Sequence, residues 1–129
     1  FSIDSGSNYN VTKTSIGWET GHSDGNVAAA PVVYAGVSLA QSTAYQQMNN
    51  GPGSAADHSM VCIVNLYSPA STTYVKQYTV TSNVYSSGDY SYIVYIGGYF
   101  NTTSAINAMR FEGYSGGTFD AKIKMYGVS

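Results

Sequence analysis

The stretch AINAMRFEGYSGGTFDAKIKMYGVS, residues 105–129, is the most informative part of the chain about fold class. It contains two strand-like runs around a Ser-Gly-Gly turn, and apolar residues alternate with polar ones along residues 119–127. Alternation with a period of two is typical of a strand that buries one face. The stretch therefore predicts a closing hairpin whose last strand lies inside the sheet. Its apolar positions are Phe119, Ala121, Ile123 and Met125.

A second alternating run, SMVCIVNL, occupies residues 59–66. We expect both runs to lie in one two-layer antiparallel sandwich, with Cys62 and Val64 buried beside Ile123 and Met125. A buried, unpaired charge is among the most destabilising changes. If Met125 is buried in this way, Met125→Asp should lower the free energy of unfolding by several kcal/mol.

Composition supports an all-β class. Only 9% of the residues are charged, and the chain holds 14 glycines and 13 tyrosines. Tyrosine favours strands and glycine favours turns. A chain of 129 residues fits one domain, residues 1–129. Turn signals at regular spacing predict about eight or nine short strands in an antiparallel, jelly-roll-like β-sandwich. The other predicted strands are residues 1–4, 9–14, 16–20, 31–39, 73–82 and 90–100, the last broken at Gly97 and Gly98.

Charge limits the partners that the chain can have. The formal net charge is −2 and only five residues are basic, which is too few to neutralise a run of phosphates. No apolar run is long enough to predict a membrane span. The single cysteine, Cys62, excludes an internal disulfide. Low charge also removes the repulsion that keeps copies apart, so we expect a homo-oligomer.

Several segments resemble a known family. "YFNTTSAINAMRF", a Ser-Gly turn and "KIKMYGV" resemble the C-terminal signature of small β-sandwich domains in virion proteins of tailed bacteriophages, especially marine ones. Residues 4–14, DSGSNYNVTKT, and residues 64–76, VNLYSPASTTYVK, resemble earlier parts of the same pattern, whereas residues 21–57 match poorly.

The resemblance implies a place in a phage particle and carries no catalytic motif. It implies the C-terminal part of a longer virion protein, most simply a trimeric fibre or spike tip. Its partners would be other virion proteins and a host-surface glycan or outer-membrane protein. A capsid decoration protein is the alternative, and a polysaccharide depolymerase is the third reading.

Tyrosine is the strongest sign of a contact surface. It offers a large contact area at low entropy cost, which suits stacking on sugar or on protein. Ordinary strand propensity is the competing explanation. Loops at the end of a sandwich vary most freely, so we expect contacts from residues 46–53, taken as an exposed loop, and from residues 85–90. The candidate binding residues are Tyr85, Tyr90, Gln46, Gln47, Asn49 and Asn50.

Catalytic and metal-binding patterns are weak. Glu19, His22 and Asp24 lie within six residues, and Asp57 adjoins His58. Histidine with carboxylates can bind a metal or transfer protons, but this spacing matches no defined motif. A depolymerase would need two carboxylates about 5–10 Å apart across a cleft. We therefore expect a binding domain without cofactor or metal, and not an enzyme.

Overall fold

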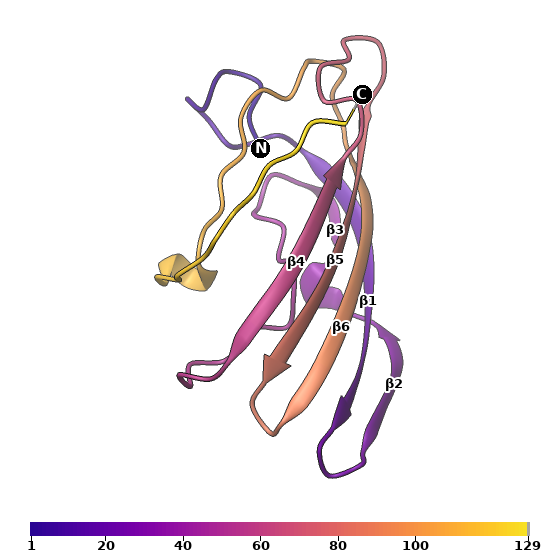
Figure 1. Cartoon of the computed structure of the whole chain (residues 1–129). Helices are drawn as coiled ribbons and strands as arrows, with labels where there is room; N and C mark the ends of the chain where they lie inside the picture. Colours follow the sequence, from indigo (N-terminus) through magenta and orange to yellow (C-terminus); the bar gives the residue numbers. More distant parts are fainter. Residues whose placement is uncertain (129) are drawn as a thin grey trace.

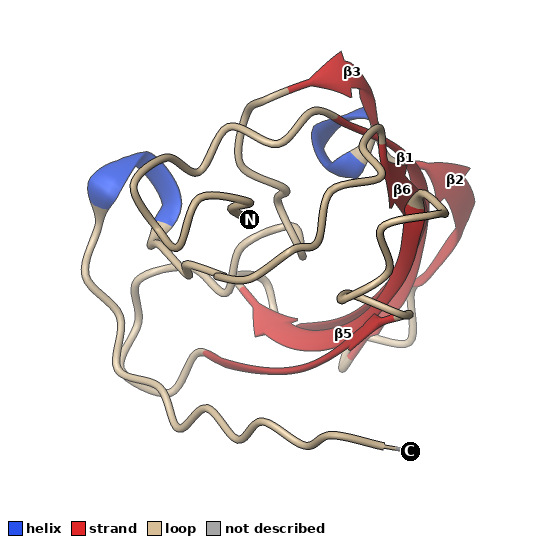
Figure 2. Ribbon diagram, turned by 90° about the horizontal axis from the view of Figure 1, so that it is seen from above, coloured by secondary structure: helices blue, strands red, loops and turns tan. Residues whose placement is uncertain are grey.

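The computed structural model describes residues 1–128, which form one curved antiparallel sheet with coil segments against its concave side (Figures 1 and 2). The sheet has six strands in the order β2-β1-β6-β5-β4, and β3 pairs with β1. This confirms the all-β, antiparallel class. Two 3-10 turns complete the regular structure. The elements are β1 (Lys13–Ser23), β2 (Ala28–Val33), η1 (Ala35–Val37), β3 (Leu39–Ser42), β4 (Ser59–Leu66), β5 (Lys76–Ser86), β6 (Tyr90–Phe100) and η2 (Tyr114–Gly116).

Strand β5 shows why the sheet forms. Tyr78, Val80 and Val84 are buried on the concave face, while Thr79 and Thr81 point to the convex, outer face. Threonine and valine suit a pleated surface that is buried on one side. Because β5 pairs with β6 along its whole length, the two strands bring their buried residues together at the centre of the sheet.

Phe100 is the aromatic centre of the core. It is fully buried, and its ring lies 4.5 Å from the Phe1 ring and 4.8 Å from the Tyr78 ring. The Tyr78 hydroxyl donates a 2.7 Å hydrogen bond to Gln46 Oε1, and Ser15 Oγ donates a second one of 2.8 Å to the same oxygen. The polar tip of the buried tyrosine is therefore satisfied by the coil segment that covers the concave face.

The concave face of the sheet is covered by coil (Figure 2), and residues 1–128 contain no second sheet. The six strands are fewer than the eight or nine expected. Residues 1–4 contribute only a bridge between Ser2 and Ala108. The expected strand at residues 31–39 is divided among β2, η1 and the start of β3. In contrast, β6 passes through Gly97 and Gly98 without a break, so the predicted interruption there was wrong.

The predicted last strand is the main correction. Residues 117–128 are irregular, and Ile123 and Met125 are 56% and 78% exposed. Cys62 and Val64 are half-buried against the core on β4. Alternation predicts a strand only where a partner edge supplies backbone hydrogen bonds, and residues 118–128 make none in the described chain. In a single copy, Met125→Asp is therefore not expected to lower the free energy of unfolding by several kcal/mol.

The N-terminal turn supplies a pH prediction. The Asp4 carboxylate accepts hydrogen bonds from Ser2 Oγ at 2.6 Å and from the Asn8 backbone and side chain at 2.9 and 2.7 Å. These bonds lower the pKa of Asp4 from 3.8 to about 2. The ionised form is favoured by the fold, so its contribution to stability is present above the unfolded pKa and is lost as the pH falls through about 2.

We expect the Asp4 carboxyl carbon to titrate by NMR with a midpoint near 2, well below the ordinary aspartate value of 3.8. Asn8→Ala removes the side-chain donor and should move the midpoint towards its usual value. A midpoint near 4 in the unchanged chain would contradict the hydrogen-bonded turn.

Candidate functional site

A row of side chains crosses the outer face of the sheet from one side to the other. The strand register places Val33 of β2 opposite Trp18 of β1, Trp18 opposite Tyr95 of β6, Tyr95 opposite Thr81 of β5, and Thr81 opposite Ile63 of β4. All but Thr81 are exposed, and no described segment covers this row. Large apolar side chains gathered on an open sheet face usually mark an interaction surface.

The centre of this row is aromatic. The Trp18 and Tyr95 rings are stacked, with centroids 4.6 Å apart and planes inclined by 26°. The two residues remain 42% and 37% exposed. Their mutual packing limits the rotation of both side chains, so the free surface is held in place before a partner arrives. A rigid aromatic surface loses little entropy on binding.

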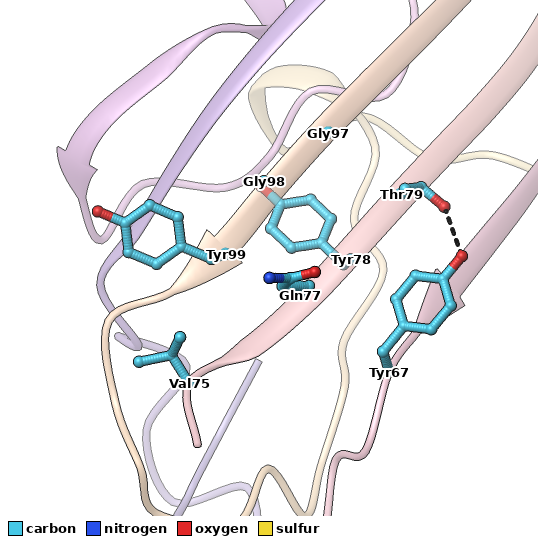
Figure 3. A pocket seen from close by; sticks show the side chains of 8 residues that line it. All are labelled: Tyr67, Val75, Gln77, Tyr78, Thr79, Gly97, Gly98 and Tyr99. Atoms are coloured by element: carbon cyan, nitrogen blue, oxygen red, sulfur yellow. Dashed lines mark hydrogen bonds between the residues drawn. The ribbon is translucent and has the colours of Figure 1, made fainter.

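Two shallow hollows flank Gly97 on the outer face. One, of about 390 Å³, is lined by Ile16, Trp18 and Tyr95 together with further residues of β5 and β6. The other, of about 440 Å³, has Tyr67 and Tyr99 at its rim (Figure 3). A Cβ added at Gly97 would meet no atom within 4 Å. Because Gly97 has no side chain, the space between the two hollows is not filled.

Uncharged hydrogen-bonding groups surround the hollows. The hydroxyl groups of Tyr67 and Thr79 lie 3.5 Å apart, and Gln41 Nε2 donates a 3.2 Å hydrogen bond to the Tyr99 hydroxyl. Gln77 also lines the second hollow (Figure 3). No charged side chain lines either hollow. The surface can therefore offer aromatic contacts and neutral hydrogen bonds, which are only weakly affected by salt.

The two tyrosines predicted at the sandwich end lie on opposite faces of the β5–β6 hairpin. Tyr85 is on the outer face, and its hydroxyl donates a 2.7 Å hydrogen bond to Asp89, which raises the pKa of Tyr85 to about 12. Tyr90 is on the concave side, where its ring stacks on Tyr92 at 5.2 Å. The structure does not bring these two side chains together.

The segment with the other predicted contact residues covers the concave face, so its description as an exposed loop was wrong. Gln46 is half-buried, and its Nε2 donates to the carbonyl oxygens of Val37 and Gln47 at 2.7 and 2.8 Å. Gln47 and Asn49 are also half-buried, whereas Asn50 is exposed. A contact between this segment and a partner stays a prediction.

The carboxylates and histidines are dispersed. Glu19 lies on the concave face of β1 and His22 on its outer face, because residues three apart on a strand point to opposite sides. Burial raises the pKa of Glu19, whose Oε2 has no hydrogen-bond partner. His58 packs edge-on against the Tyr85 ring at 5.6 Å. Within residues 1–128, no group of three or more His, Cys, Asp or Glu residues could hold a metal ion.

Sequence reasoning did not single out Trp18, Tyr95 and Gly97 as one site. Each lies in or beside a predicted strand, but periodicity does not reveal that β1 and β6 are neighbours. The available signal was the alternation of Ile16 and Trp18 with polar or small residues, which indicated a second apolar face.

Comparison of the chain with protein-family models, with curated proteins and with solved structures finds no match. Among the described residues, no helix is long and apolar enough to cross a membrane.

Proposed function

We propose that the chain is a non-catalytic adhesive domain of a phage particle, placed at a fibre or spike tip, that contacts the host surface through the outer face of its sheet. The exposed Trp18–Tyr95 stack beside the hollows at Gly97 is the observation that carries the binding role. The phage setting is supported by the resemblance of residues 4–14, 64–76 and 99–128 alone.

A glycan suits this surface better than a charged ligand. One face of a sugar ring carries C–H groups that pack on aromatic rings, and its hydroxyl groups need neutral donors and acceptors. Trp18 and Tyr95 offer the rings, while Gln77, Thr79 and Tyr67 offer the hydrogen-bonding groups. An outer-membrane protein is the second class of host receptor that this surface could contact.

The jelly-roll arrangement and the trimer implied by the resemblance remain part of the proposal. A jelly roll has two sheets. Residues 1–128 supply one sheet, so strands of the second would have to come from other chain segments or from other copies.

The test measures binding of the purified chain to host cells and to isolated host polysaccharide. Trp18→Ala and Tyr95→Ala should each weaken binding by about 1–2 kcal/mol, or roughly tenfold, if these rings are anchors. Tyr114→Ala is the matched control, because Tyr114 is 85% exposed but lies in η2, outside the sheet. The affinity should change little with salt.

Other outcomes separate the alternatives. Loss of binding in Tyr85→Ala but not in Trp18→Ala would favour the hairpin end over the sheet face. Binding to the capsid and not to cells would indicate a decoration protein. Turnover of polysaccharide that is lost in Glu19→Gln would identify a depolymerase and reject the non-catalytic role.

A further inference from the structure

We infer that residues 118–128 of one copy add as a strand to the free edge of β4 in a second copy. We call these residues the arm. The inference rests on two unpaired features of one chain, a free sheet edge and a free strand-like segment, and does not depend on the proposed receptor surface.

The first feature is the outer edge of β4. This strand is last in the sheet and pairs only with β5, so its other edge presents unpaired backbone groups. It has eight residues, SMVCIVNL, without charge or proline. Proteins usually protect such edges with charges, proline or very short strands, as the opposite side of this sheet does with Pro31 in β2 and the four-residue β3. An uncharged edge of this length is a template for another strand.

The second feature is the arm itself. Its apolar residues are exposed, with Phe119 at 52%, Ile123 at 56% and Met125 at 78%. No hydrogen bond joins residues 118–128 to the rest of the described chain. In Figure 1 the arm, drawn in yellow, leaves η2 as an extended chain outside the sheet. An extended segment that alternates apolar and polar residues, and that satisfies none of its backbone groups internally, suits strand addition.

The two features match in length and in pattern. Residues 119–126 alternate over eight positions, the length of β4. On the concave side of β4, Cys62, Val64 and Leu66 are only half-buried. An added strand could place Phe119, Ala121, Ile123 and Met125 beside them and leave Asp120, Lys122 and Lys124 on the outer face in water.

The occupant is a second copy because the chain's own arm leaves its own β4 edge empty (Figures 1 and 2). The low net charge of −2 opposes association only weakly. Addition of each arm to the next copy is a head-to-tail contact, which closes into a dimer or a small ring if the rotation permits.

The single cysteine provides the test, because Cys62 lies on the concave side of β4. Directly opposite residues on neighbouring strands have Cα atoms about 4.5–5.5 Å apart, within reach of a disulfide. We would place one cysteine at a time in the full chain and oxidise under mild conditions. Ala121→Cys, Ile123→Cys and Met125→Cys test the face beside Cys62, and Lys122→Cys and Lys124→Cys are the matched controls on the opposite face.

In any one register only one of the first three positions lies directly opposite Cys62, so we expect disulfide-linked products of two or more chains from at least one of these variants and from neither control. Cys62→Ser combined with that variant should abolish the link to β4. The arm residues are exposed in one copy, so these changes leave its fold intact. Links within single chains would overturn the inference in favour of the chain's own edge. Links from all five variants alike, or from none, would overturn strand addition altogether.

Association of the chain without added cysteines gives an independent readout. Light scattering at increasing concentration should show a mass above that of one chain, and Ile123→Asp should weaken association at least tenfold. Lys124→Ala should leave association unchanged. A single-chain mass at all concentrations would also reject the inference, while host binding through Trp18 and Tyr95 could still hold.

Discussion

Replacement of Phe100 by alanine is expected to lower the free energy of unfolding by about 3–5 kcal/mol, a large share of the roughly 5–15 kcal/mol of a typical domain. Phe100 is fully buried and packs against the rings of Phe1 and Tyr78. The neighbours belong to the N-terminal segment and to β5, so they cannot close the cavity without moving the sheet. Chemical denaturation followed by tyrosine and tryptophan fluorescence gives the measurement.

Met125→Asp is the control for this experiment at low protein concentration, where single copies dominate. Because Met125 is 78% exposed, the change should alter stability by less than about 0.5 kcal/mol. If Met125→Asp lowered the free energy of unfolding by several kcal/mol, Met125 would be buried, as in the closing strand that the sequence predicted. If Phe100→Ala lowered the free energy of unfolding by less than about 1 kcal/mol, Phe100 would not be at the centre of the core.

The second large effect is expected at Gly98. An alanine Cβ there would lie 2.7 Å from the Thr14 carbonyl oxygen and 2.8 Å from the Tyr78 ring. The first contact is with backbone in the neighbouring strand and the second is with a buried ring, so neither can move easily. We expect Gly98→Ala to cost about 1–3 kcal/mol, the usual range for overpacking.

Gly97→Ala is the matched control, one residue away on the opposite face. Its Cβ would meet no atom within 4 Å, so stability should stay constant or rise by up to about 1 kcal/mol. The same methyl group would occupy the floor between the two hollows, and a change in binding at unchanged stability would support their role. Equal destabilisation by both substitutions would show that the two faces of β6 are not as described.

The strands at the centre of the sheet could be predicted from the sequence. The alternation in residues 59–66 and 73–82 predicted β4 and most of β5 correctly, and it put Tyr74, Lys76, Tyr78 and Val80 on one face. The last three share the buried face of β5, whereas Tyr74 precedes the strand and is 73% exposed. Lys76 is buried, and its ammonium group donates a hydrogen bond to the carbonyl oxygen of Ser104 at 2.6 Å. Alternation succeeded here because each of these strands has a neighbour that completes its hydrogen bonds.

For the candidate site, the sequence predicted only the kinds of residue that it contains. Excess tyrosine and low charge indicated an aromatic, neutral surface, but not its position. The loop residues chosen from turn signals proved to be divided between the two faces, or turned towards the core as Gln46 is. Which strands are neighbours depends on contacts distant in sequence, and these contacts placed Trp18 beside Tyr95.

By itself, the sequence determined the all-β class, the inward and outward faces of individual strands and the neutral character of the surface. These properties depend on local propensity, period and composition. The tertiary structure alone decided which alternating runs became strands, since a strand requires a neighbour for its backbone hydrogen bonds. It left the alternating run at residues 119–126 exposed and assembled the Trp18–Tyr95 surface from strands about 80 positions apart in the sequence.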